Sequence, residues 1–488
     1  MYQSVIGLEI HIELNTRSKM FCGCVNDPNE RHPNVNICPI CLGHPGTLPV
    51  INKEAIKKVI KTALSFNCQI PPLSKFDRKS YFYPDLPKGY QISQYDTPLS
   101  KSGYLDFKVN DEKRRVRIRR VHLEEDTGRL IHPKGKDYSL VDFNRAGIPL
   151  MELVTEPDLR IAKEARKFSE ELQLILRYLD VSSADMEKGQ MRVEANVSLA
   201  SQEDVKKGKL GVKVEIKNLN SFRAVERAIN YEIKRQEKIL TSGKIIVQET
   251  RGWDEISGVT KSQREKEYAH DYRYFPEPDL PPITWQKKDI EKIRAEIPEL
   301  PQPRRQRLQK EYHLSDKETE FFVFNKELEE YFEKVISELE PKLSPSKLSA
   351  LIKLTINYLI TDLQGLLKGE SVAVKDFLIT PENFAEFITL IHQGKISSKI
   401  AKMVLEEMFK TGADPSHIID EKELIQITDE THIEEIVNQA ISENPKAVSD
   451  LKQGKEGALQ FLIGQVMAKT KGRANPEIVS KILEKKLT

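Results

Sequence analysis

The sequence has few cysteines, no long apolar run and almost no net charge, and each shortage excludes a class of protein. Five cysteines in 488 residues are too few for a disulfide-stabilised scaffold. No run of about 18 uncharged apolar residues occurs, so we expect no transmembrane helix. Lys and Arg number 76 against 74 Asp and Glu, and the net charge of +2 gives no argument for nucleic-acid binding by the chain as a whole.

Targeting segments and common catalytic motifs are also missing. The N-terminal MYQSVIGLEIHIEL has neither the basic-then-apolar pattern of a signal peptide nor the Arg/Ser-rich pattern of a transit peptide. We therefore expect a cytoplasmic protein with no membrane partner. There is no Gly-rich phosphate loop of the usual spacing and no G-x-S-x-G elbow, so the chain has no self-contained nucleophile system.

The first 285 residues mix strand and helix patterns. Period-two alternation predicts strands, and apolar residues at helical spacing predict helices. Strands are expected at 6–14, 191–199 and 211–219 and in a hairpin over 104–122 that turns at Asn110-Asp111; helices are expected at 52–66, capped by Asn52, at 160–179, and from Ser221 to Gly243. This mixture predicts an α+β domain with a largely antiparallel sheet.

Strand patterns almost vanish in the second half of the chain. The proline-rich stretch 271–303 predicts an extended connection and a domain boundary. Residues 304–410 predict consecutive helices, one of which begins at Thr380-Pro381. TGADPSHIID, at 411–420, is a second break, and several short helices are expected over 421–488. The length agrees with about three domains.

Four cysteines have metal-ligand spacing. Cys22-Gly23-Cys24 and Cys38-Pro39-Ile40-Cys41 are separated by thirteen residues. Two close thiolate pairs with a polar loop between them suit tetrahedral Zn²⁺, and a site with four cysteine ligands has no open position, so the zinc would be structural. The alternative is four reduced cysteines without a metal.

Histidine and carboxylates alternate with apolar residues on two expected strands. These residues are Glu9, His11 and Glu13 on the first strand, and His122, Glu124 and Asp126 on the second. If the strands are neighbours, oxygen ligands and imidazole converge at one place, which suits Mg²⁺ or Mn²⁺. The same alternation is routine on a solvated sheet face, and the spacing alone favours that alternative.

Several segments are rich in groups that bind anions. They are residues 76–98, which include Arg78, Lys79, Ser80 and Lys88; MRVEANV, with Arg192, Glu194 and Asn196; and EIKNLNSFR, which leads into a helix N-terminus at Ser221. Each of them also suits an ordinary surface loop.

Basic residues gather near the C-terminus. They are Lys452, Lys455, Lys469, Lys471 and Arg473, which flank the apolar run 458–466. A basic helical module suits contact with a nucleic-acid backbone, and ordinary solvated lysines explain the pattern equally well.

Together these segments resemble a known family. The segments are IGLEIHIEL, CPICLGHPGTLPV, KSYFYPDLPKGYQISQ, HLEEDTGR, DFNRAGIPLMELVTEPD, EIKNLNSF and AHDYRYFPEPDLPP. In the same order over nearly the full length, they resemble the B subunits of tRNA-dependent (aspartyl/glutamyl-tRNA) amidotransferases. The resemblance implies a catalytic cradle domain with a zinc knuckle at 22–41, a helical domain and a tRNA-binding tail domain. With the boundaries indicated by the prolines and the TGADP break, these domains are 1–290, 291–412 and 413–488.

The resemblance also implies an activity and its partners. Such a ligase converts Glu-tRNA(Gln) to Gln-tRNA(Gln), or Asp-tRNA(Asn) to Asn-tRNA(Asn), with ATP. The B subunit would phosphorylate the side-chain carboxylate and transfer ammonia to it. An amidase (A) subunit would release the ammonia from glutamine, a small C subunit would bridge the chains, and misacylated tRNA would be the substrate. The absence of a nucleophile system in this chain agrees with that division.

The resemblance assigns residues as well. Glu9, His11 and Glu124 match positions around the family's Mg²⁺ and are the expected catalytic residues; Glu13, Glu125 and Glu152 are further candidates. On residue type and setting, the candidates for ATP or substrate contacts are Lys79, Arg192, Lys217 and Asn218. The four cysteines match the zinc knuckle. Two rival functions remain, a zinc-bearing tRNA-binding module without catalysis and a stand-alone ATP-dependent ligase.

Overall fold

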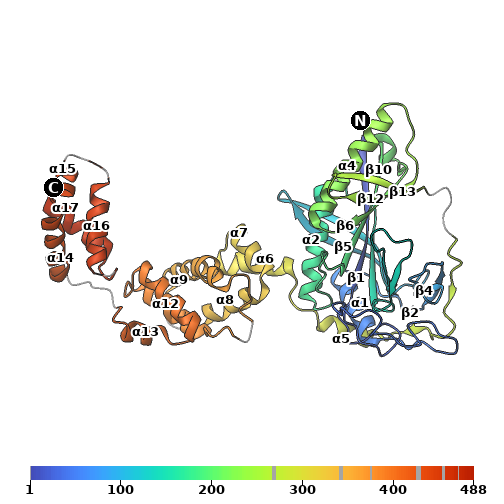
Figure 1. Cartoon of the computed structure of the whole chain (residues 1–488), viewed down its shortest axis with the longest axis horizontal. Helices are drawn as coiled ribbons and strands as arrows, with labels where there is room; N and C mark the ends of the chain where they lie inside the picture. The colour runs from blue at the N-terminus through green and yellow to red at the C-terminus, as the bar shows by residue number, and fades with distance from the viewer. Residues whose placement is uncertain are drawn as a thin grey trace. The chain divides into compact units, whose positions relative to one another are not determined.

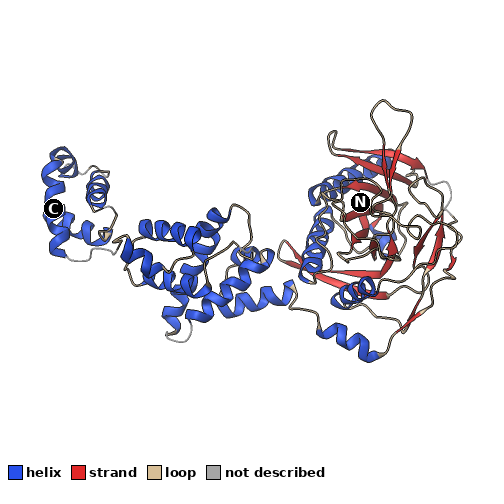
Figure 2. Ribbon diagram, turned by 60° about the horizontal axis from the view of Figure 1, so that its bottom comes forward, coloured by secondary structure: helices blue, strands red, loops and turns tan. Residues whose placement is uncertain are grey.

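The computed structural model describes residues 2–265, 271–339, 344–373, 376–424, 430–452, 455, 457–470 and 472–487 (Figure 1). Its internal contacts divide the chain into two compact units, residues 1–303 and 304–488. Strands occur only in the first unit among the described residues, and the second unit is helical (Figure 2). The expected α+β class with helical C-terminal regions is therefore confirmed.

An eight-stranded sheet organises the first unit. Its order is β13-β12-β11-β10-β1-β9-β6-β5. The strands are β1 (Tyr2–Glu13), β5 (Ser100–Val109), β6 (Glu112–Glu125), β9 (Pro149–Thr155), β10 (Met191–Ser201), β11 (Val214–Leu219), β12 (Glu249–Asp254) and β13 (Val259–Glu265). Only the β11–β12 pair is parallel, so the sheet is largely antiparallel, as expected.

Local signals explain where these elements begin and turn. The β5–β6 hairpin turns at Asn110 and Asp111, which both adopt positive φ, as a type I′ turn requires. Asn52 accepts hydrogen bonds from the amides of the first turn of α1 (Lys53–Ser65). Ser221 caps α4 (Phe222–Thr241) in the same way. The predicted hairpin and both predicted caps are confirmed.

Helices and one face of the sheet enclose the core of the first unit. Leu8, Ile10 and Ile12 of β1 are almost fully buried and belong to the same apolar cluster as residues of α1, α2 (Ala162–Tyr178) and α4. Helices α2 and α4 pack against each other and lie beside the sheet (Figure 1). Because successive side chains of a strand point to opposite faces, the polar residues of β1 lie on the other face.

The proline-rich stretch is not an extended connection. β14 (Phe275–Pro276) pairs with β3 (Asp77–Ser80), which pairs with β4 (Tyr90–Ser93), and β15 (Ile283–Thr284) pairs with β2 (Leu73–Ser74). α5 (Lys287–Ala295) packs on α1 through partly buried isoleucines. This part of the prediction was wrong because prolines at strand edges and between short elements are compatible with packing on a core. The first unit also contains β7 (Arg129–Ile131), β8 (Leu140–Asp142) and the short α3 (Gln202–Lys206).

The second unit consists of consecutive helices. They are α6 (Pro301–Tyr312), α7 (Asp316–Phe324), α8 (Lys326–Leu339), α9 (Pro345–Asn357), the π-helical η2 (Tyr358–Leu363), α10 (Gln364–Leu367), α11 (Pro381–His392), α12 (Ser398–Thr411), α13 (Pro415–Glu421), α14 (Glu430–Glu443), α15 (Pro445–Lys452), α16 (Ala458–Lys469) and α17 (Pro476–Leu487). Helices α14, α16 and α17 share a small apolar core of their own. The predicted division at residues 290 and 412 stays a prediction. No helix among the described residues is long and apolar enough to cross a membrane.

Candidate active site and metal centres

A row of polar residues crosses four neighbouring strands on the face opposite the apolar core. The strand registers place His122 of β6 opposite Glu152 of β9, Glu152 opposite His11 of β1, and His11 opposite Arg192 of β10. Glu152 lies 3.3 Å from Nε2 of His122 and 3.5 Å from Nε2 of His11. The carboxylate of Glu152 is therefore within ion-pair distance of both imidazoles.

The two expected acidic strands are not neighbours. Strand β9 lies between β1 and β6 and supplies Glu152 at the centre. Glu124 nevertheless reaches His11, at 3.5 Å. Two groups of residues each have possible ligand atoms that lie within 4.8 Å of one another. One group is Glu9, His11 and Glu152, and the other is His122, Glu124 and Glu152. The structure thus places all three residues expected at a magnesium site beside Glu152, together with His122, which the alternation included and the family resemblance did not assign.

The cluster of Glu9, His11, His122, Glu124 and Glu152, called the carboxylate–imidazole cluster below, is largely buried. His122, Glu124 and Glu152 are each 5% exposed or less. A solvated sheet face would leave these side chains in water, so their burial favours a built site over that alternative. The signal for His122 was present in the sequence, since it shares the alternation of Glu124.

Burial and neighbouring charges shift the pKa values of residues in the cluster. Burial and the neighbouring Glu152 raise the pKa of Glu9 to about 7. Burial alone would lower the pKa of His11, but its hydrogen bond to Glu152 and the charge of Glu124 raise it to about 9. The pKa of Glu152 is held well below its usual range by His122 and His11, against the effect of burial. The negative charge of the carboxylates in the cluster thus favours a positively charged group among them.

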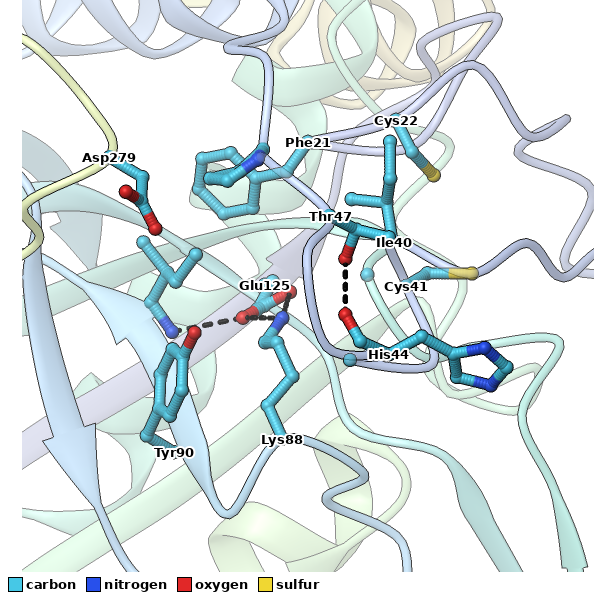
Figure 3. Close-up of a pocket in the computed structure, with 14 residues that line it drawn as sticks. Phe21, Cys22, Ile40, Cys41, His44, Thr47, Lys88, Tyr90, Glu125 and Asp279 are labelled. Atoms are coloured by element: carbon cyan, nitrogen blue, oxygen red, sulfur yellow. Dashed lines mark hydrogen bonds and ion pairs between the residues drawn. The ribbon is translucent and has the colours of Figure 1, made fainter.

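Strand β4 holds the end of β6 in place. Glu125 accepts a hydrogen bond from the Ile92 amide at 2.9 Å and pairs with Lys88 at 2.5 Å. Ser93 donates to Glu124 at 3.3 Å. Figure 3 shows Lys88 pointing at Glu125, with Cys41 of the cysteine-rich loop lining the same pocket. Glu125, a further candidate in the sequence, therefore lies beside the cluster with its charge already neutralised.

Lys79 of β3 lies among aromatic rings next to the cluster. Its ammonium is 5.0 Å from the ring centre of Tyr272 and 5.8 Å from that of Tyr81. Burial opposes its charge, yet the carboxylates of Glu124 and Glu152 raise its pKa. Lys79 is therefore a cation held near the carboxylates without a close ion pair among the described residues.

Glu13 and Arg192 take part in a different network. Asp126 accepts from Arg192 at 3.0 Å and from Arg145 at 2.6 Å, and Arg145 also contacts Glu13. Burial raises the pKa of Glu13 to about 7 despite Arg145. Although Arg192 lies opposite His11 in the sheet, its guanidinium is bound to Asp126.

The other two sequence candidates lie on β11. Lys217 donates to Glu194 at 2.9 Å and lies 3.5 Å from Glu215, and these charges raise its pKa although burial opposes it. Asn218 adopts a φ of +64° and donates to the carbonyl of Trp253 at 2.8 Å. The contacts of Asn218 thus connect it to β12 instead of the carboxylate–imidazole cluster.

The four cysteines form the second possible metal centre. The sulfurs of Cys22, Cys24, Cys38 and Cys41 all lie within 4.8 Å of one another. Cys38 and Cys41 are brought together by a tight turn in which the Leu42 amide donates to the Cys38 carbonyl at 3.0 Å. Mutual hydrogen bonding lowers the pKa of Cys41 to about 5 and raises that of Cys22. This arrangement brings four sulfur atoms close together, so the expected cysteine cluster is confirmed as one that could hold a metal.

Comparison with known proteins identifies the family. Residues 4–291 match the GatB/GatE catalytic domain and residues 330–487 match the GatB domain. The chain belongs to the GatB/GatE family. Relatives named as B subunits of the aspartyl/glutamyl-tRNA(Asn/Gln) amidotransferase include those of Thermotoga sp. strain RQ2 (47% identical), Caldicellulosiruptor saccharolyticus (49%) and Persephonella marina (49%), each matched over 100% of this chain and 99% of the relative. The resemblance predicted from the sequence is confirmed.

Two of the five C-terminal basic residues of this GatB/GatE family member pair with carboxylates. Lys455 binds Asp450 at 2.7 Å and Lys469 binds Glu443 at 2.8 Å. Arg473 donates to the carbonyl of Glu423 at 3.1 Å. Lys452 is exposed, and Lys471 lies outside the described residues. The tail therefore presents less free positive charge than its composition indicates.

Proposed function

We propose that this chain activates and amidates the side-chain carboxylate of misacylated Glu-tRNA(Gln), Asp-tRNA(Asn) or both, with ATP as co-substrate. Membership of the GatB/GatE family makes it a subunit of an amidotransferase, a ligase-type enzyme. The observation that carries the assignment to this chain is the buried carboxylate–imidazole cluster with Lys79 beside it.

The chemistry requires activation because a carboxylate is a poor electrophile. Attack by ammonia would place a second negative charge beside the first. Transfer of the ATP γ-phosphoryl group to the carboxylate gives ADP and an acyl phosphate, in which phosphate is a good leaving group. Ammonia then attacks the acyl carbon, phosphate departs with the C–O bond electrons, and a proton is lost from nitrogen to leave the amide.

The chain's own residues suit the phosphoryl-transfer step. Glu9, His11 and Glu124, with Glu152, offer carboxylate oxygens and an imidazole nitrogen as ligands that would suit Mg²⁺. A bound Mg²⁺ would neutralise phosphate charge during transfer. Lys79 would bind phosphate oxygens, since its ammonium stays charged beside the cluster. Of the other candidates, Arg192 and Lys217 would have to exchange a carboxylate partner for substrate.

The proposal includes partner chains and tRNA. The relatives are named as B subunits, which places them in a multi-subunit enzyme. We infer an amidase A subunit that supplies ammonia and a small C subunit. The tail from residue 413 onward would contact the misacylated tRNA, as its exposed Lys452 permits.

Glutamate 124 offers the sharpest test. In the assembled enzyme, Glu124→Gln should abolish Glu-tRNA-dependent ATP hydrolysis and amidation, even with free ammonia, while glutamine hydrolysis by the amidase subunit stays detectable. The variant removes the negative charge of one proposed metal ligand. Charge neutralisation by a bound metal ion stabilises the transition state by several kcal/mol, so its loss should stop phosphoryl transfer. The measurement is the rate of phosphate release with and without Glu-tRNA.

Glu112→Gln is a matched control, because Glu112 is an exposed carboxylate at the β5–β6 turn. Its rates should equal those of the unchanged enzyme. Normal amidation by Glu124→Gln at limiting Mg²⁺ would overturn the site assignment. If the unchanged enzyme shows no ATP turnover with Glu-tRNA, the chain is a tRNA-binding module. If it amidates free glutamate, it is a stand-alone ligase.

The four cysteines are proposed to bind one structural Zn²⁺. We expect about one zinc per purified chain, because a site of four thiolates is closed. Replacing Cys38 and Cys41 by serine should remove the metal and lower the melting temperature. The check is metal analysis of freshly reduced, untagged protein, and a chain that contains no zinc would refute the assignment.

A further inference from the structure

A buried lysine lies against the cysteine cluster. Lys19 is 0% exposed and is one of the largest fully buried side chains among the described residues. Its Nζ lies 3.8 Å from Sγ of Cys41 and 3.3 Å from the carbonyl oxygen of Phe143. In the part of the chain that the structure describes, no ion pair joins this ammonium to a carboxylate.

A buried ammonium without a carboxylate partner needs another source of negative charge. Taking a lysine out of water is costly unless its charge is compensated. A carbonyl oxygen accepts a hydrogen bond but carries no net charge. The side chain that contacts the ammonium is Cys41, which also accepts a hydrogen bond from the Cys38 amide at 3.1 Å.

Zinc bound by four thiolates is an anionic group. Four thiolate charges against one divalent cation leave a net charge of about −2. We propose that the Lys19 ammonium is the buried counter-charge of the zinc–thiolate centre and stabilises the metal-bound state. This inference depends on the zinc assignment made above.

The surrounding chain is shaped to keep Lys19 in contact with the centre. Gly147, at a φ of +87°, packs beside both residues, since a Cβ there would be at ordinary van der Waals distance from Cδ of Lys19 (3.6 Å) and Cβ of Cys41 (3.5 Å), and 4.0 Å from Oε2 of Glu125. The Lys19 amide also donates to the Cys24 carbonyl at 2.9 Å. Lys19 is therefore fixed at its backbone by one cysteine of the cluster and at its ammonium by another.

The experiment compares the full-length chain with Lys19→Met, which keeps most of the length of the side chain and its apolar stem and removes its charge. The matched control is Lys61→Met, because Lys61 also donates to a backbone carbonyl, that of Leu179, at 3.1 Å. Zinc affinity is measured by competition with a chromophoric chelator. We expect zinc binding to be weaker by about 10–100-fold for Lys19→Met, the range typical of residues that support metal ligands, and no change for Lys61→Met.

A second readout separates a counter-charge from simple packing. Without zinc, the cysteine cluster carries less negative charge than the zinc–thiolate centre, so removing the Lys19 charge should leave the melting temperature nearly unchanged. With zinc, Lys19→Met should melt lower. A packing role predicts a lower melting temperature in both states and unchanged zinc affinity, and that result would overturn the proposal.

The remaining outcomes are also decisive. A Lys19→Met chain that cannot be recovered folded, with or without zinc, contradicts the expected stability of its metal-free form and overturns the proposal. Equal zinc affinity in Lys19→Met and wild type does the same. Wild-type chain that binds no zinc would instead refute the zinc assignment itself, so the two failures are distinguishable.

Discussion

At the scale of single residues, the candidate site is organised by charges that compensate one another across strands. Glu152 forms ion pairs with two imidazoles, and Asp126 forms ion pairs with two guanidinium groups. Each of these carboxylates is 6% exposed or less. Such a carboxylate keeps its charge only because its partners are present, so removing either member of a pair leaves an uncompensated charge.

Asp126 gives a pH-dependent prediction. Burial opposes its ionisation, but Arg192 and Arg145 lower its pKa to about 2 from 3.8. A lowered pKa contributes stability that is complete above pH 3.8 and is lost as the pH falls through about 2. Asp126→Asn should therefore lower the free energy of unfolding by about 2–3 kcal/mol at pH 7, and by progressively less below pH 4.

Urea unfolding of wild type and variant between pH 7 and pH 3 measures this difference. Asp106→Asn is the control, since Asp106 pairs with Arg115 at an exposed site and should change stability much less. A deficit for Asp126→Asn that stays constant down to pH 3 would show that the ion pairs do not cause it.

The composition of the site could be predicted from the sequence only in part. Alternation identified two polar strand faces, one with Glu9, His11 and Glu13 and one with His122, Glu124 and Asp126, since period two is a local property. The family resemblance then selected Glu9, His11 and Glu124. It did not identify β9 between the two strands, because strand order depends on long-range packing. Glu152 therefore stayed a secondary candidate, although the structure places it between both histidines.

At the scale of elements, the features with local chemical causes were predicted well. The Asn110-Asp111 turn and the caps at Asn52, Ser221 and Thr380 all have the expected conformations. The stretch 271–303 was predicted wrongly because prolines limit backbone hydrogen bonding but do not determine whether a segment packs on a core. Two of its short strands pair with β3 and β2.

Asn52 connects helix α1 to the cysteine-rich loop. Its side chain accepts from the Glu54 amide at 2.9 Å and donates to the carbonyls of Ser18 and Lys19 at 3.0 and 3.2 Å. Asn52→Ala should therefore lower the free energy of unfolding by about 2 kcal/mol. Loss of an ordinary N-cap lowers it by roughly 1 kcal/mol.

The comparison variant is Ser221→Ala, because Ser221 caps α4 through a single bond to the Ala224 amide. Thermal unfolding of both full-length variants tests the prediction. Equal losses of melting temperature in the two would mean that the bonds from Asn52 to the loop contribute nothing.

At the scale of the whole molecule, the chain combines a catalytic unit with a helical unit whose last helices have their own core. Ile433, Val437, Leu462 and Val479 belong to that small core. The segment around residue 414 belongs to the helices before it, since α13 packs on α11 and α12 and Ser416 bonds Glu386. A truncation that leaves the remaining chain intact should therefore remove residues 430–488 and keep α13.

Deleting residues 430–488 should weaken tRNA binding by the assembled enzyme without unfolding the rest. The bonds across this cut include those from Ser397 to the Gly472 carbonyl at 3.0 Å and from Arg473 to the Glu423 carbonyl at 3.1 Å, and neither belongs to an apolar core. If tail lysines neutralise phosphates, the slope of log affinity against log salt should fall by about 0.7–0.9 for each phosphate that the truncated tail no longer binds.

Single lysine variants of the full chain refine this prediction. Lys452→Ala should lower the salt slope by about the amount expected for one phosphate, because Lys452 is exposed. Lys455→Ala should lower it less, because Lys455 is bound to Asp450. The measurement for both variants is the dissociation constant for Glu-tRNA at two salt concentrations, with melting temperatures alongside.

A tail that only packs on its neighbours gives a different result from a tail that binds tRNA. In that case truncation would leave the affinity and the salt slope unchanged, and the melting temperature would fall. If the tail does bind tRNA, free ammonia and a high concentration of charged tRNA should restore much of the amidation by the truncated enzyme. The reason is that the carboxylate–imidazole cluster and Lys79 all lie in the first unit, so the truncation removes affinity for the substrate and leaves the groups proposed for its chemistry in place.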